Sequence, residues 1–203
     1  MNNKLVRNLL FSGLGLVVLL LFAWQYGFLT KGTNRHSPSG IASIGGPFTL
    51  TDHTGTVRTE KDFRGKLMLI YFGYSFCPDV CPTALQIMSV ALQNLGDGAK
   101  SITPIFITVD PERDTVSHLK AYIQNFYVDM IGLTGTAEQL KQAAKAYRVY
   151  YRKAKSEKES DALEYLMDHS SVVYLMDRDG RYLTHFTHQS RSDDILKTVR
   201  KHL

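Results

Sequence analysis

The chain has 203 residues, of which 44% are hydrophobic and 21% are charged. This composition is that of an ordinary globular protein, and it excludes disorder, collagen and coiled coil for the chain as a whole. The net charge is +5, but four basic residues precede the first acidic residue, Asp52, so the remainder is nearly neutral and gives no indication of nucleic-acid binding.

The first predicted element is a membrane anchor within residues 1–28. Residues 9–28 carry no charged side chain, and twenty helical residues span about 30 Å, the thickness of the hydrocarbon core of a bilayer. Trp24 and Tyr26 lie near one end of this run, where an aromatic belt is expected. With the amino terminus counted, three positive charges precede the run and two follow it, which slightly favours an N-terminus on the inner face of the membrane.

Three other interpretations of this run are weaker. A cleaved signal peptide has a shorter apolar region of about 7–15 residues followed by a small-x-small site, whereas residues 29–31 read Leu-Thr-Lys. A buried helix of a soluble protein normally shows a polar stripe. A mitochondrial transit peptide is rich in arginine, and only two basic residues precede the run. An uncleaved anchor is therefore favoured.

Residues 29–46 are rich in Gly, Ser, Thr and Asn, which is typical of a flexible linker. A soluble domain is expected over residues 47–203. Hydrophobic spacing and turn residues predict its elements. In chain order they are a buried strand over 66–73, a helix over 83–95, a buried strand over 102–109, a helix over 115–126, a short strand over 131–133, a helix over 136–147 with a capping box, a hairpin of strands 172–176 and 182–186, and a helix over 192–203.

The order of these elements predicts the fold class. A strand, a helix and a second buried strand favour a parallel pair joined by a right-handed crossover. The later hairpin adds antiparallel strands. We therefore expect an α/β domain with a mixed sheet and helices on both faces, a thioredoxin-like pattern.

The segment Gly73–Pro82 (GYSFCPDVCP) carries both cysteines of the chain, between a buried strand and a helix. Pro82 suits the first helical position, which places Cys81 near the helix cap and Cys77 in the preceding turn. The helix N-terminus is expected to lower the pKa of both thiols. Two thiolates this close can form a disulfide, exchange disulfides or bind a soft metal ion such as Cu(I) or zinc.

The spacing bears on these three possibilities. A disulfide here closes a very short loop and constrains the unfolded chain little, so a purely structural staple is disfavoured. Thioredoxin-type exchange uses Cys-x-x-Cys, whereas this chain has Cys-x-x-x-Cys. This difference in spacing favours metal binding over thioredoxin-type disulfide exchange.

A stable site needs a further ligand, for which imidazole is the usual choice. His169 precedes strand 172–176, and the loop that enters this strand in a thioredoxin-like fold faces the cysteine turn. His118 is placed on a polar helix, and His185 lies on the terminal hairpin. His169 is therefore the favoured ligand, with His185 next. Asp110, which follows the second buried strand, either caps a turn or lies near the site, and we do not assign it as a ligand.

Three segments together resemble the Sco (SenC) family: FCPDVCP, VDPERDT (109–115) and DHSSVVYLMDRDG (168–180). Members of that family are membrane-anchored copper-binding proteins involved in cytochrome c oxidase assembly, and their domain is thioredoxin-like. The resemblance implies that Cys77, Cys81 and His169 are copper ligands, for Cu(I), Cu(II) or both. One common family variant has Thr-His before the first cysteine, where this chain has Ser75 and Phe76.

The resemblance implies a copper metallochaperone held on the bacterial inner membrane by one helix, with its domain in the periplasm; the mitochondrial inner membrane is less favoured. The expected partners are the copper-bearing subunit of cytochrome c oxidase and other copper chaperones or thiol reductants, with no nucleic acid. The alternative is a membrane-tethered thiol–disulfide oxidoreductase that uses Cys77 and Cys81 without copper. A third possibility is an assembly scaffold with a structural disulfide.

Overall fold

The computed structural model of the chain describes residues 21–22, 44–154 and 165–203. The expected anchor over residues 9–28 lies outside the described residues except for Leu21 and Phe22, which are helical and exposed. The linker up to residue 43 also lies outside them. Among the described residues, no helix is both long enough and apolar enough to cross a membrane. Ser43–Leu203 form one compact unit, to which the following description applies.

The centre of this unit is a seven-stranded sheet in the order β2-β1-β5-β4-β3-β8-β9. Its strands are β1 (Thr49–Asp52), β2 (Val57–Thr59), β3 (Leu67–Gly73), β4 (Ile102–Thr108), β5 (Ile131–Thr134), β8 (Val172–Met176) and β9 (Tyr182–Thr187). Strands β3, β4 and β5 are parallel, and β8 and β9 form an antiparallel hairpin beside β3. All seven residues of β3 are buried, because this strand has neighbours on both sides and helices on both faces.

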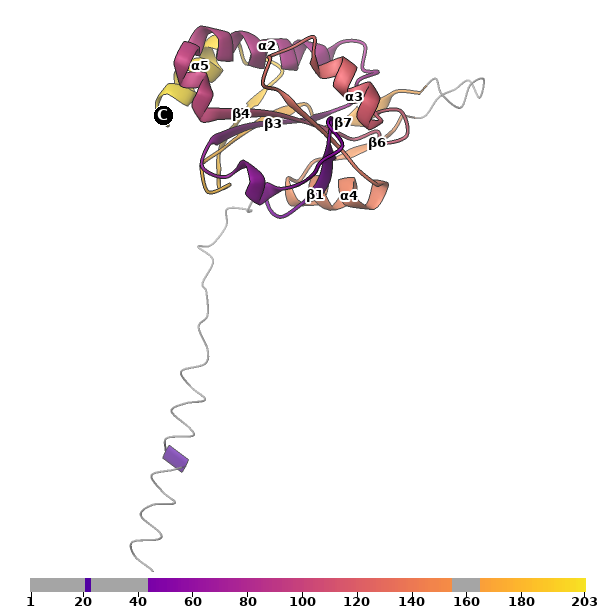
Figure 1. The fold of residues 1–203 in the computed structure, drawn as a ribbon, viewed down its shortest axis with the longest axis horizontal. Helices are drawn as coiled ribbons and strands as arrows, with labels where there is room; N and C mark the ends of the chain where they lie inside the picture. Colours follow the sequence, from indigo (N-terminus) through magenta and orange to yellow (C-terminus); the bar gives the residue numbers. More distant parts are fainter. Residues whose placement is uncertain (1–20, 23–43, 155–164) are drawn as a thin grey trace, which may run out of the picture. The chain divides into compact units, whose positions relative to one another are not determined.

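The helices cover both faces of the sheet, as Figure 1 shows. They are α2 (Val80–Leu95), α3 (Val116–Ile123), α4 (Ala137–Ala146) and α5 (Ser192–Arg200), with 3-10 helices η1 (Glu60–Phe63) and η2 (Gly96–Ser101). Helices α2, α3 and α5 lie over one face, and α4 lies over the other. This is the thioredoxin-like α/β arrangement that the order of the predicted elements indicates.

Several local predictions are confirmed. β3 and β4 pair in parallel over their whole lengths. The capping box of α4 is present, with Thr136 accepting from the backbone of Gln139 and the Gln139 side chain accepting from the backbone of Thr136. Gly96 ends α2 with a φ of 61°, a conformation that glycine adopts without strain.

The start of α2 differs from the prediction. The helix begins at Val80, not at residue 83, so Pro82 is its third residue and not its first. Proline is accommodated there because the backbone N–H groups of the first turn have no partner within the helix. Cys81 therefore lies inside the first turn of α2.

The sequence prediction also missed short strands. Besides β1 and β2, a separate two-stranded sheet consists of β6 (Tyr151–Lys153) and β7 (Met167–His169), which pair antiparallel. Strands of three or four residues are too short to show an alternating pattern. The omission matters because β7 carries His169.

Candidate metal centre

The two cysteines lie where β3 gives way to α2. Cys77 is in the turn between these elements, and Cys81 is the second residue of α2. Both are free thiols and both are buried, with 8% of Cys77 and none of Cys81 exposed. Cys77 is therefore the thiol that solvent or a partner reaches first.

His169 approaches the cysteines from β7. Its Nε2 lies 3.2 Å from Cys81 Sγ. Its Nδ1 lies 3.2 Å from the carbonyl oxygen of Ser170. In the tautomer that carries its proton on Nδ1, this carbonyl accepts a hydrogen bond and the Nε2 lone pair is available to a metal ion. The rings of Tyr71 and Tyr74 contact the imidazole edge-on, with centroids 6.2 and 5.7 Å away.

The three predicted ligand residues thus come together. The two Sγ atoms and a His169 ring nitrogen all lie within 4.8 Å of one another. This is the one such grouping of three or more His, Cys, Asp or Glu side chains among the residues that the structure describes. Two sulfurs and an imidazole nitrogen are the donors that copper and zinc prefer, so the residues present fit such an ion.

The electrostatics of the two thiols differ from the prediction that both would be acidified. The hydrogen bond from Cys81 lowers the pKa of Cys77, with smaller contributions from His169 and the backbone N–H groups of Asp79 and Cys81. The same hydrogen bond, together with burial, raises the pKa of Cys81. The prediction is wrong for Cys81. The proton shared with Cys77 and burial away from water raise the pKa of this thiol by more than the helix N-terminus lowers it.

Gly73, the last residue of β3, makes room for the site. A Cβ atom at this position would lie 2.9 Å from Cys81 Sγ and 2.8 Å from the Tyr71 ring. Ordinary contacts of a Cβ atom begin near 3.4 Å. A glycine is required here by the close approach of its neighbours.

Other histidines lie outside this cluster. His185 contacts Tyr182 on β9. The placement of His118 on a polar helix was incomplete: its Nε2 lies 2.8 Å from Ser75 Oγ, and its ring stacks on Phe76 with a centroid distance of 4.9 Å. His118 thus contacts the cysteine turn without joining the cluster.

Two acidic residues near the site were not assigned from the sequence. Asp110 and Asp114 are buried, with 1% and 0% exposed. Both belong to the turn between β4 and α3, at the edge of the sheet where parallel strands end and ligands commonly bind. The sequence signals were the position of Asp110 after a buried strand and the VDPERDT segment (109–115), which contains both residues.

Comparison with known proteins gives the family. The family model of SCO1/SenC matches residues 36–203. The chain belongs to the SCO1/SenC family. The bovine mitochondrial SCO2 homolog is 38% identical over 204 residues, covering 98% of this chain and 74% of that protein. The human mitochondrial SCO1 homolog is 40% identical over 177 residues, covering 86% of this chain and 57% of that protein.

Solved SCO1/SenC structures support the fold. The structure of Bradyrhizobium japonicum ScoI with copper bound matches with a TM-score of 0.72 and 40% identity, covering 79% of this chain and 100% of that one. The copper-bound structure of yeast Sco1 matches with the same TM-score and 38% identity, covering 79% and 88% of the two chains. The thioredoxin-like domain expected from the sequence is therefore confirmed.

Proposed function

We propose that this SCO1/SenC protein is a copper metallochaperone, with Cys77, Cys81 and His169 as the ligands of its cargo. The observation that carries the proposal is the approach of the three ligand atoms to within 4.8 Å of one another. Copper in the structures of the Bradyrhizobium and yeast relatives supports the choice of metal. Two thiolates suit Cu(I), and the imidazole makes the site acceptable to Cu(II) as well.

The surroundings of the site suit transfer of the ion. Cys77 and His169 line a surface pocket together with the exposed residues Asp79, Val80 and Leu166. A partner's ligands can therefore approach from the Cys77 side. We propose that the acceptor is the copper-bearing subunit of cytochrome c oxidase, as the family resemblance implies, with other copper chaperones or thiol reductants as upstream partners.

Copper titration of the full chain in detergent tests this function. The reduced protein should bind one equivalent of Cu(I), and replacement of Cys77 or Cys81 by serine should abolish tight binding. A Ser117→Ala variant, which changes an exposed residue of α3, serves as the control. If the reduced protein binds no copper, the metallochaperone proposal fails.

A second function uses the same thiols. Cys77 is the more accessible of the two buried thiols, and its lowered pKa favours attack on a client disulfide. The Cys77 thiolate forms a mixed disulfide and releases one client thiolate. Cys81 then gives its proton to the client thiolate released in the first exchange and attacks Cys77, which releases the second client thiolate and leaves a Cys77–Cys81 disulfide. The client gains the two electrons that the cysteine pair loses, and reduction of a disulfide-bonded client in metal-free buffer tests this step.

We also propose the organisation expected from the sequence: an anchor within residues 1–28, a linker over 29–46 and a domain over 47–203, with the domain on the periplasmic side of a bacterial inner membrane. The uncharged run over residues 9–28 supports the anchor. Deletion of residues 1–30 should release a folded, copper-binding domain from the membrane fraction. A truncated protein that stays with the membrane, or does not fold, would contradict this organisation.

A further inference from the structure

The turn between β4 and α3 contains charged side chains that are buried. It reads Asp110-Pro-Glu-Arg-Asp114, and Asp110 and Asp114 are buried. The Arg113 side chain is only 7% exposed, and its Nε donates to Asp110 Oδ2 at 2.6 Å. Buried charges are costly unless they are paired, so this arrangement requires an explanation. None of the three residues belongs to the ligand cluster.

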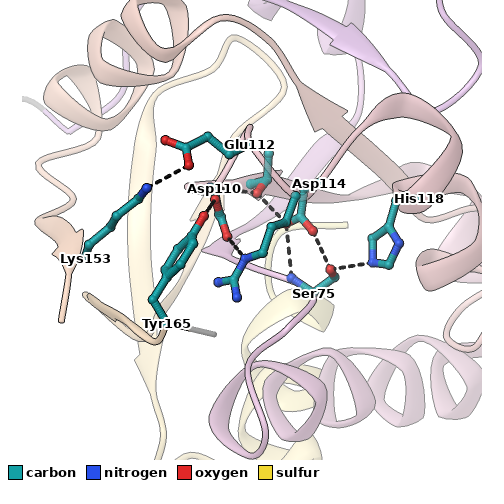
Figure 2. Close-up of polar contacts among 9 residues, drawn as sticks. Ser75, Asp110, Glu112, Asp114, His118, Lys153 and Tyr165 are labelled. Atoms are coloured by element: carbon teal, nitrogen blue, oxygen red, sulfur yellow. Dashed lines mark hydrogen bonds and ion pairs between the residues drawn. The ribbon is translucent and has the colours of Figure 1, made fainter. Parts of the chain in front are cut away.

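One side of the turn holds the cysteine segment. Asp114 accepts hydrogen bonds from the backbone N–H of Ser75, at 3.1 Å, and from the Ser75 hydroxyl, as Figure 2 shows. Thr108 donates to the same carboxylate at 2.5 Å. Ser75 lies two residues before Cys77. The Arg113 guanidinium carbon also lies 4.7 Å from the centroid of the Phe76 ring.

The other side of the turn holds the β6–β7 sheet. Tyr165, which precedes β7, donates its hydroxyl hydrogen to Asp110 Oδ1 at 2.6 Å (Figure 2). Lys153 of β6 forms an ion pair with Glu112 at 2.7 Å. The Arg113 guanidinium carbon lies 3.7 Å from the centroid of the Tyr165 ring. These contacts tie the strand pair that carries His169 to the same turn.

Arg113 therefore contacts both segments that carry the ligand residues, through Phe76 on the cysteine side and Tyr165 on the histidine side. We propose that Arg113 is a positioning residue that holds His169 in reach of the two cysteines. Asp110 orients the guanidinium, and the flat cation packs against both rings. The proposal rests on the proposed copper site, and it explains why a charged turn is buried beside that site.

The two oxidation states of copper should respond differently to loss of this contact. Cu(I) is held by two thiolates, so it depends little on the imidazole. Cu(II) requires the nitrogen ligand. Removal of a group that contacts a metal ligand directly lowers metal affinity by about 10- to 100-fold, and Arg113 acts one step further out, through Phe76 and Tyr165. We therefore expect weakened Cu(II) binding and nearly unchanged Cu(I) binding.

Arg113→Lys in the full chain is the main test, because lysine keeps the charge and loses the planar stacking and the Nε donor. Arg58→Lys is the matched control: Arg58 Nε also pairs with a buried carboxylate, that of Asp52 at 2.8 Å, but it lies in β2 at the far edge of the sheet. Tyr165→Phe is a milder second variant, since it removes only the hydroxyl donor and keeps the ring.

Three measurements are made on each variant. They are the Cu(I) affinity, the Cu(II) affinity together with the nitrogen hyperfine coupling in the electron paramagnetic resonance spectrum of the Cu(II) complex, and the hydrogen exchange of the metal-free protein. Arg113→Lys should lose up to about 10-fold in Cu(II) affinity, the lower end of the range for a direct partner of a ligand, weaken the nitrogen signal and speed exchange in both 74–77 and 165–169. Tyr165→Phe should show a smaller change of the same kind, and Arg58→Lys none.

Failure of the proposed function and failure of the role of Arg113 give different results. A wild-type protein that binds no copper refutes the proposed function, while hydrogen exchange in the metal-free protein still decides the role of Arg113. Unchanged exchange in 165–169 and an unchanged Cu(II) spectrum in Arg113→Lys overturn the positioning role. If Arg113→Lys does not fold, Tyr165→Phe decides by the same two readouts.

Discussion

Replacement of Gly73 by alanine should damage the metal centre while leaving its three ligand residues in place. The added Cβ would lie 2.8 Å from the Tyr71 ring, 2.9 Å from Cys81 Sγ and 3.1 Å from the Phe106 ring. An ordinary contact needs at least 3.4 Å, so Cys81 Sγ must shift by about 0.5 Å. Binding sites tolerate displacements of about this size only at a loss of function.

The stability cost follows from the same contacts. Strand β3 is buried along its whole length, and Cys81 is fixed in the first turn of α2, so neither side relaxes freely. Overpacking of this kind costs about 1–3 kcal/mol. For a domain of this size, the melting temperature should fall by about 2–12 °C. The affinity for Cu(I) should fall by about tenfold, because the displaced atom is itself the proposed ligand.

Gly55→Ala separates loss of stability from damage to the site. Gly55 has a φ of +88°, and a Cβ there meets no atom within 4 Å, so the substitution only strains the backbone. The strain costs about 1–2 kcal/mol. Thermal unfolding of both variants without metal, followed by Cu(I) competition titration, makes the comparison. Wild-type Cu(I) affinity in Gly73→Ala, or an equal loss in Gly55→Ala, would refute the steric reasoning.

The remaining predictions concern the nitrogen ligand, redox state and pH. His169→Ala should weaken Cu(II) binding far more than Cu(I) binding, whereas His118→Ala should match the wild type in paired titrations; equal behaviour of the two variants would place the third ligand elsewhere. Protein with a Cys77–Cys81 disulfide should take up little copper until it is reduced, since the metal needs both sulfurs as thiolates; equal uptake before and after reduction, with thiols counted, would exclude shared sulfurs. Burial alone would raise the pKa of Asp52, but hydrogen bonds from Thr54, Arg58 and Thr56 lower it well below its usual range. The ionised carboxylate therefore stabilises the fold above about pH 4, and this stability is lost as the pH falls further. Melting temperatures between pH 2 and pH 7 should show a smaller acid dependence in Asp52→Asn, and an unchanged acid dependence would contradict the assignment.

The sequence predicts those parts of the domain in which one physical signal dominates. The continuous apolar runs of β3 and β4 have no other stable location than the centre of a sheet. The Thr136 and Gln139 pair gave the start of α4 directly. The cysteines are predictable because unusual chemistry coincides with a strand–helix junction, and His169 because it precedes strand 172–176, whose entry loop faces that junction in a thioredoxin-like fold.

The missed features depend on contacts between distant segments. β6 and β7 have three residues each, and their strand character comes from pairing across residues 151–169. The buried Asp114 carboxylate accepts a hydrogen bond from the backbone N–H of Ser75, which is 39 positions away in the chain. The opposite shifts of the two cysteine thiols arise from a hydrogen bond between them, whereas the sequence argument considered only the helix N-terminus.

The β6–β7 sheet is separate from the main sheet, so the cysteine side and the histidine side of the metal centre are expected to differ in local stability. The cysteines adjoin β3, a strand with paired neighbours on both sides, whereas His169 ends a strand of three residues with a single partner. Short, partly exposed elements open locally at far lower free energy than central strands. We therefore expect the β6–β7 sheet to open locally more often than β3, against the contacts that tie it to the turn of residues 110–114, while the two sulfurs stay in place. Such an opening would leave copper on the two sulfurs and free the histidine position for an incoming ligand.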